Sequence, residues 1–321
     1  MVAGEQTSQN VLGHESVLAE LRRAWASGTG PRTLLLAGPE GVGRRTVAHW
    51  FAALVNCARS DTPEAPCWTC PSCLAAAAGT HIDIREIAPG DRTKSGRSTA
   101  RALITIDRLV ARQGGDPEPL GDWLRTRPQH RYRVGIIDGA SSLTEGAANA
   151  FLKTLEEPPS WAVIVLIAAG QDALLPTVAS RCTTIRLGPV ELAGFDDLAG
   201  HPGLRLGQPG ALLRARAAAG PTEAARRAAN ELLNALDGDL LELLTTAETF
   251  TKALTEAAEA GVRPGPLGWL LEPLRSLTPH AYAESVDAVT KCERALQNYA
   301  QAALACSVLA LELRRIRLAG G

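Results

Sequence analysis

A glycine-rich turn at residues 38–46, GPEGVGRRT, limits the folds that are open to this chain. It follows an apolar run at 33–37 that is typical of a buried strand, and it precedes a helix-forming segment at 44–56. Gly38 and Gly43 have the interval of a phosphate-binding loop, in which backbone N–H groups and a helix N-terminus surround phosphate oxygens. The turn predicts an α/β domain that begins with a nucleotide-type loop, with a chance glycine-rich turn as the alternative.

Strand-like and helical segments alternate through the first half of the chain. Apolar runs at 133–137 and 162–168 predict two more buried strands. The segment 144–157 between them has helical periodicity and ends at Pro158 and Pro159, where a helix cannot continue. Strands separated by helices predict a parallel sheet covered by helices.

The second half has a different composition. From about residue 211 onward, helix-forming segments carry apolar residues at three-to-four spacing, which predicts a separate all-helical domain. The segment 188–210 is rich in glycine and proline and is the expected junction. A length of 321 residues agrees with two or three domains.

Charge and hydropathy exclude some classes of function. The net charge of −1 gives no basic footprint at the level of the whole chain. No apolar run reaches transmembrane length and no secretory signal pattern opens the chain, so we expect a cytoplasmic protein without a membrane partner. One local basic stretch, which we interpret as a solvated face with contact to DNA phosphate as the alternative, contains Arg125, Arg127, Arg131 and Arg133.

The side chains of the loop differ from those of a working ATPase. The frame of Gly38, Gly41 and Gly43 is complete. The expected lysine is replaced by Arg44, however, and the expected serine or threonine, whose hydroxyl would ligate magnesium, is replaced by Arg45. Thr46 follows one residue too late, and its hydroxyl is expected to point elsewhere because a helix turns by about 100° per residue.

A second defect lies at an independent position. The segment RVGIIDGA resembles the acidic strand of such ATPases and ends at Asp138. The next residue is usually a glutamate that prepares the attacking water, but here it is Gly139. Losses at two positions predict a chain that does not hydrolyse ATP, and they leave open whether the glycine frame still binds a nucleotide.

Four closely spaced cysteines predict a metal centre. Cys57, Cys67, Cys70 and Cys73 offer thiolates that can close a tetrahedral structural zinc site, with an iron–sulfur cluster or free thiols as alternatives. His81 could replace one ligand, although it lies farther along the chain. The remaining cysteines, which we interpret as small buried hydrophobes, are Cys182, Cys292 and Cys306.

A longer motif adds a family resemblance. Residues 143–159 read LTEGAANAFLKTLEEPP, and they are followed by the strand candidate AVIVLIAA and by the tripeptide SRC at 180–182. Together these segments resemble bacterial clamp-loader subunits of the AAA+ superfamily, from about residue 11 to 190. The resemblance implies a RecA-like AAA+ domain at 1–188 with a zinc module at 57–73.

The defects are more similar to delta-prime subunits of the DNA polymerase III holoenzyme than to the ATP-hydrolysing tau/gamma subunits. Gly210, in GQPGALL, stands where active subunits carry an arginine that senses nucleotide. The stretch between Pro189 and Gly207 is short for the usual lid. The resemblance therefore implies a reduced lid domain at 189–222 and a helical collar domain at 223–321.

In this family the arginine of SRC is an arginine finger, which enters the ATP site of the adjacent subunit and stabilises charge on the γ-phosphate. The resemblance assigns this role to Arg181, with a surface salt bridge as the alternative. It implies tau/gamma and delta subunits as partners, with the sliding clamp and primed DNA contacted through the complex at the nucleoid. Two other functions stay open: an active ATPase that tolerates Arg44, and a zinc-containing module that binds DNA.

Overall fold

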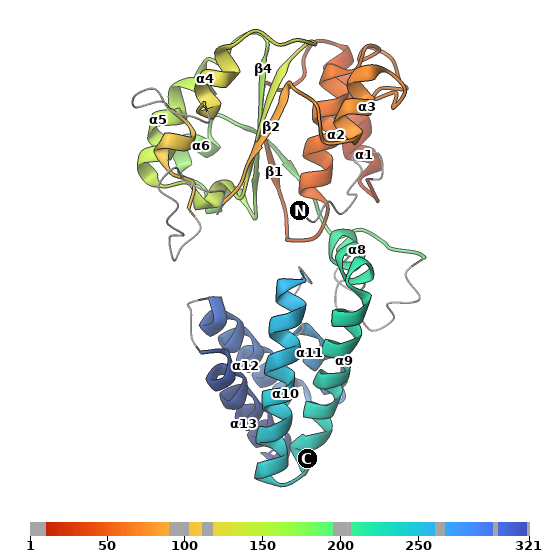
Figure 1. The fold of residues 1–321 in the computed structure, drawn as a ribbon, viewed down its shortest axis with the longest axis vertical. Coiled ribbons are helices and arrows are strands. Elements are labelled where there is room, and N and C mark those ends of the chain that lie inside the picture. Colours follow the sequence, from red (N-terminus) through yellow and green to blue (C-terminus); the bar gives the residue numbers. More distant parts are fainter. Residues whose placement is uncertain are drawn as a thin grey trace. The chain divides into compact units, whose positions relative to one another are not determined.

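The computed structural model describes residues 11–89, 103–110, 118–194, 204, 207–260, 267–297 and 301–319. The chain divides into an N-terminal unit, Met1–Val190, and a C-terminal unit, Glu191–Gly321 (Figure 1). Among the helices in these ranges, none has the length and apolar character needed to cross a bilayer.

A parallel five-stranded sheet forms the centre of the N-terminal unit, with strand order β2-β3-β4-β1-β5. This arrangement confirms the predicted parallel sheet covered by helices. The strands are β1 (Thr33–Ala37), β2 (Ile84–Ile87), β3 (Arg133–Asp138), β4 (Ala162–Ala168) and β5 (Thr183–Arg186).

Helices cover both faces of this sheet (Figure 1). One face packs against α1 (Glu15–Ala26), α2 (Arg44–Asn56) and α3 (Pro71–Ala77). The other face packs against α4 (Leu120–Arg125), α5 (Glu145–Glu156) and α6 (Pro176–Ala179). Short 3₁₀ turns complete the unit at Ile106–Arg108, Ala140–Ser142 and Gln171–Ala173.

Strand β1 contributes to two hydrophobic cores, because successive side chains of a strand point to opposite faces. Leu34 and Leu36 belong to the core under α1 and α2, and Leu35 belongs to the core under α4 and α5. All three are fully buried. The apolar run that predicted this strand thus contributes side chains to both cores.

The C-terminal unit is all-helical, as its composition predicts. Its helices are α8 (Pro209–Ala217), α9 (Ala219–Asn234), α10 (Leu240–Glu259), α11 (Gly268–Leu274), α12 (Pro279–Gln297) and α13 (Ala302–Ala319), with a 3₁₀ turn at Ala235–Asp237. Helices α9 to α13 enclose one core in which Phe250 is fully buried.

The predicted domain boundaries compare with this division as follows. The break after Val190 lies close to the expected end of the α/β domain at 188. Residue 222, the predicted end of the lid, lies inside the continuous helix α9. Residues 195–203 and 205–206 of the predicted lid fall outside the described residues, so the separate lid stays a prediction.

Candidate functional site

The glycine-rich turn has the backbone form of a phosphate loop. It connects the carboxyl end of β1 to the first residue of α2. Gly41 and Gly43 have φ values of 83° and 103°, a left-handed conformation that favours glycine. Gly38 has no room for a side chain, because a Cβ atom there would overlap the carbonyl oxygen of Leu187. The glycine frame is therefore required by this turn.

Arg45 joins the loop helix to two neighbouring strands. Its Nε donates to Oε1 of Glu86 at 2.7 Å, and its Nη2 donates to Oε2 at 2.8 Å. The same Nε lies 3.9 Å from Oδ2 of Asp138. Glu86 lies on β2 and Asp138 ends β3, so one guanidinium group bridges acidic side chains from adjacent strands.

A histidine completes this ion-pair cluster, which we define as Arg45, His49, Glu86 and Asp138. Nε2 of His49 lies 2.9 Å from Oε2 of Glu86, whose side chain is 16% exposed. Burial by itself would raise the pKa of Glu86, but its hydrogen bonds with His49 and Arg45 outweigh that effect, so the pKa is lowered. Sequence reasoning singled out neither Glu86 nor His49 for this site.

The remaining predicted positions of the loop lie nearby. Burial and the charge of Glu86 raise the pKa of Asp138. Burial lowers the pKa of Arg44, although the nearby negative charge of Asp138 acts to raise it. Thr46 is the third residue of α2. The structure thus brings together the acidic strand and both arginines, as the motif spacing predicts.

Gly139 follows Asp138 directly and adopts a left-handed backbone, with φ of 73°. A Cβ atom placed on it would lie 3.0 Å from Cγ of Pro89, so any side chain would be strained and crowded. Gly210 is the second residue of α8 in the other unit, and its part in a nucleotide site stays a prediction.

Arg181 directly follows the C-cap residue of α6, Ser180. Its Nε donates to Oε1 of Glu156 at 2.6 Å, its Nη2 forms an ion pair with the same oxygen, and its Nη1 donates to the carbonyl of Thr177 at 2.7 Å. The arginine side chain is 32% exposed. In the isolated chain Arg181 therefore forms a partly exposed salt bridge. A surface salt bridge is the alternative to an arginine finger that the sequence left open.

The four cysteines gather as their spacing predicts. Their Sγ atoms all lie within 4.8 Å of one another. Cys57 directly follows α2, and Cys70 is the N-cap residue of α3. In a tetrahedral site with Zn–S bonds of about 2.3 Å the sulfur atoms stand about 3.8 Å apart, which this cluster can accommodate.

Hydrogen bonds to the sulfur atoms also fit a bound metal. The Sγ of Cys67 accepts from the N–H of Cys70 at 3.4 Å, and the Sγ of Cys57 accepts from the N–H of Arg59 at 3.4 Å. A hydrogen bond from Thr69 contributes most to lowering the pKa of Cys67, to about 5. Donors directed at sulfur stabilise thiolates, which are the form that binds metal. The donor set therefore fits a structural Zn²⁺ held by all four cysteines.

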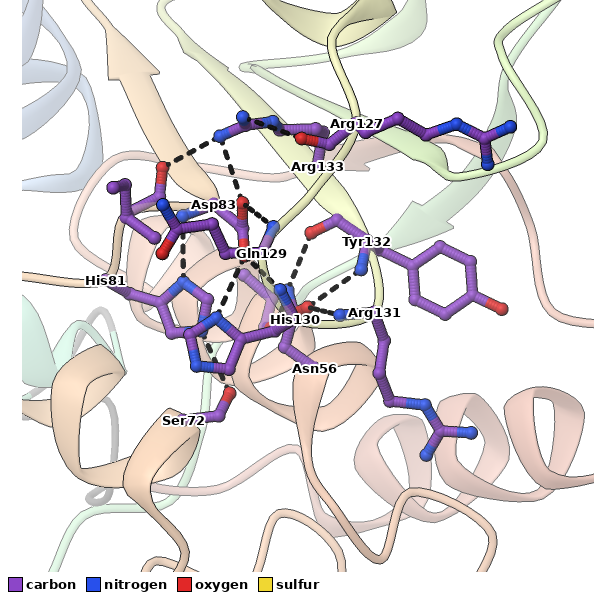
Figure 2. Close-up of polar contacts among 12 residues, drawn as sticks. Asn56, Ser72, His81, Asp83, Arg127, Gln129, His130, Arg131, Tyr132 and Arg133 are labelled. Atoms are coloured by element: carbon purple, nitrogen blue, oxygen red, sulfur yellow. Dashed lines mark hydrogen bonds and ion pairs between the residues drawn. The ribbon is translucent and has the colours of Figure 1, made fainter.

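A second group of possible metal ligands, His81, Asp83 and His130, is instead a closed hydrogen-bond network (Figure 2). The fully buried carboxylate of Asp83 accepts from the N–H groups of Gln129 and His130, at 3.0 and 2.7 Å. It also accepts from Nδ1 of His130 and Nη1 of Arg133, both at 2.9 Å. We call these residues, together with Ser72, the Asp83 network.

His81 is occupied within the Asp83 network and does not replace a cysteine. Its Nδ1 accepts from the N–H of Asp83 at 3.1 Å, so its Nε2 carries the proton and donates to Oγ of Ser72 at 2.9 Å. Burial lowers the pKa of His81 to about 4. Because Ser72 lies on α3, the network links the cysteine segment to the sheet.

The four arginines of the basic stretch differ in burial: Arg133, the first residue of β3, is buried, and the other three are exposed. Arg133 is only 9% exposed and pairs with Asp83. Arg131 donates from Nη1 to the carbonyl of Cys57 at 3.1 Å and to Oγ of Ser60 at 2.6 Å. The interpretation of the stretch as a solvated face is therefore wrong for Arg133, which is buried, whereas the side chains of Arg125, Arg127 and Arg131 are exposed.

Comparisons with known proteins identify related sequences. The family model described as "DNA polymerase III, delta subunit" matches residues 13–191. A Pseudomonas aeruginosa DNA polymerase III subunit delta' is 35% identical over 149 residues, which cover 46% of this chain and 40% of the relative. A Mycobacterium tuberculosis subunit gamma/tau is 33% identical over 174 residues, which cover 53% of this chain and 27% of that protein. The matched region thus spans less than half the length of either relative.

A comparison with solved structures concerns the fold. A DNA polymerase III gamma subunit-related protein from Thermotoga maritima aligns with a TM-score of 0.55 over 92% of this chain and 100% of its own. At 20% identity this likeness concerns the fold alone.

Proposed function

The chain belongs to the DNA polymerase III delta-subunit family, and we propose that it is a clamp-loader subunit that does not hydrolyse ATP and that donates Arg181 to a neighbouring ATP site. The membership agrees with the resemblance carried by residues 143–159 and by SRC at 180–182. The proposed partners are the tau/gamma and delta subunits. Contact with the sliding clamp and primed DNA is proposed to occur through the assembled complex at the nucleoid.

Two features support the absence of hydrolysis. The position that would supply a magnesium-binding hydroxyl carries the guanidinium group of Arg45, which offers donors and no acceptor. The position after Asp138 carries no side chain that could orient a water molecule. An isolated chain with both defects lacks the metal ligand and the base that ATP hydrolysis uses.

The observation that carries the proposal is the placement of Arg181. It is partly exposed after a short helix, in a chain whose own loop lacks hydrolytic groups. The guanidinium fork that binds Glu156 at rest can equally bind phosphate oxygens, since arginine pairs with both in the same planar geometry. An exposed ion pair contributes only about 0–1 kcal/mol. Replacing the Arg181–Glu156 ion pair with a contact between Arg181 and the γ-phosphate in a neighbouring subunit therefore requires little free energy.

The C-terminal unit supports assembly. One face of α13 exposes a stripe of large apolar side chains at helical spacing: Leu304, Val308, Leu311 and Leu318. Such a stripe suits packing against a helix of another subunit. We propose that this unit is the collar, and that the cysteine cluster holds one structural Zn²⁺ that cross-links α2 to α3.

The test is reconstitution with purified tau/gamma and delta subunits. We expect Arg181→Ala to remain folded and to assemble, and to lower DNA-stimulated ATP turnover by more than tenfold, because an arginine finger contributes about 10³–10⁵ in kcat at its site. Arg23→Ala, an exposed arginine on α1, is the matched control and should leave turnover unchanged.

Three outcomes would contradict the proposal. Normal turnover with Arg181→Ala would remove the finger. ATP hydrolysis by the isolated chain would favour an active ATPase. Tight, salt-dependent DNA binding by the isolated chain would favour a nucleic-acid module.

A further inference from the structure

We infer that Arg45 is a built-in cation that occupies the place of the divalent metal in this phosphate-loop site, so that the site excludes Mg²⁺. The inference rests on the proposed absence of ATP hydrolysis, and it goes further by assigning a structural role to the group that replaced the metal ligand.

The positions of the interacting groups give the first argument. Phosphate-loop ATPases hold Mg²⁺ between the serine or threonine of the loop and the aspartate of the acidic strand. In this chain those two positions are Arg45 and Asp138, and Nε of the arginine lies 3.9 Å from Oδ2 of the aspartate. The two residues that would share a metal ion are thus paired directly with each other.

Glu86 gives the second argument. It adds a second carboxylate, which binds the guanidinium through both oxygens at 2.7 and 2.8 Å. A two-point pair of this kind fixes the orientation of both side chains. The guanidinium group is therefore held beside the strand ends by a partner on β2, while the Arg45 side chain remains 54% exposed.

The chemistry of Mg²⁺ gives the third argument. The ion requires about six oxygen ligands at about 2.0–2.1 Å in near-octahedral geometry. A guanidinium group offers only donors, and its positive charge repels a second cation. Mg²⁺ could reach the carboxylates of Glu86 and Asp138 only if Arg45 moved away, which would break three close interactions.

The same carboxylates predict what happens when the cation is removed. Both are largely shielded from solvent, with side-chain exposures of 16% and 34%. Without Arg45 they would face each other with much of their compensating charge gone. Like charges at close range bind either a proton or an added cation. A hydroxyl at position 45 would add the missing oxygen ligand, so the site should then accept a divalent ion.

The experiment uses Mn²⁺ as the probe, because it prefers oxygen ligands as Mg²⁺ does and its free concentration can be measured by electron paramagnetic resonance. The full chain with its native metal content is titrated with Mn²⁺. We expect wild type and Asp138→Asn to bind Mn²⁺ equally weakly. We expect Arg45→Thr to bind one Mn²⁺ at least tenfold more tightly than wild type, and Arg45→Thr with Asp138→Asn to lose that gain.

Two further variants keep the test decisive. Arg23→Thr removes the same charge outside the ion-pair cluster and should bind Mn²⁺ as wild type does. If Arg45→Thr does not fold by circular dichroism, Arg45→Gln removes the charge with a longer side chain and should show the same dependence on Asp138.

Binding of Mn²⁺ to wild type that is lost in Asp138→Asn would overturn the inference, and so would a folded variant without charge at position 45 that gains no Mn²⁺. Such Asp138-dependent Mn²⁺ binding by wild type, without ATP turnover, would overturn this inference alone. ATP turnover by the isolated wild-type chain would overturn the proposed function.

Discussion

Replacing Asp83 with alanine removes the central acceptor of the Asp83 network in Figure 2. Arg133, which is 9% exposed, would lose its ion-pair partner, and breaking a buried pair in this way costs about 3–5 kcal/mol. Arg133 keeps hydrogen bonds to the carbonyls of Ile82 and Arg127, at 3.2 and 2.9 Å. We therefore expect the lower end of the range, a loss of about 3 kcal/mol in the unfolding free energy of the N-terminal unit.

Urea unfolding followed by tryptophan fluorescence measures this loss, because Trp123 lies 4.7 Å from the Arg133 guanidinium and reports on the same region. Asp83→Asn keeps the shape and one acceptor oxygen, so its loss should be smaller, about 2 kcal/mol. Asp61→Ala, at an exposed position, is the control and should change stability by less than about 0.5 kcal/mol. A loss below about 1 kcal/mol in Asp83→Ala would refute the reasoning.

The same carboxylate predicts a pH dependence. Burial would raise the pKa of Asp83, but the N–H groups of Gln129 and His130 and the charge of Arg133 outweigh it, so the folded pKa is lowered. The stabilisation is fully present above the unfolded value of about 3.9 and is lost as pH falls through the lower folded value. Asp83→Asn should therefore lose less stability than wild type across that acidic interval.

The other predictions concern the metal and the acidic strand. Protein purified without added zinc should contain about one zinc per chain. Cys70→Ser should lower both the zinc content and the melting temperature, because metal binding contributes directly to folding. Wild-type protein without zinc would contradict the assignment. Gly139→Glu should not restore ATP hydrolysis in a turnover assay, since Arg45 remains, and it should destabilise the N-terminal unit by about 1–3 kcal/mol because φ is 73° and Pro89 is close.

The strands that the sequence predicted are those buried on both faces. β1, β3 and β4 appear as continuous apolar runs because helices cover both sides of the sheet. β2 was missed because its sequence, IREI, carries two charged residues. β5 was missed because TTIR lies at the edge of the sheet, with both of its end residues exposed.

The candidate site likewise has parts that the sequence predicted and parts that it did not. The cysteine cluster was predictable, since short spacings along the chain bring all four thiols together. The pairing of Arg45 with Glu86 was not, because 41 residues separate them and only the parallel pairing of β2 with β3 places Glu86 beside the acidic strand. The Asp83 network shows the same limit: in the sequence His81 was considered only as a possible ligand beside the cysteines, but its ring lies 4.5 Å from that of His130, 49 residues along the chain.

The place of β1 in both cores has a mechanical consequence for the loop that follows it. Leu34 and Leu36 are anchored on one side of the sheet and Leu35 on the other, and β4 and β5 flank the strand. Local opening of such a strand would expose both cores at once, so its opening free energy approaches that of unfolding the whole unit. The glycine frame of the loop thus follows directly on a strand that resists local opening. A force applied at Gly38 would be distributed over the entire sheet.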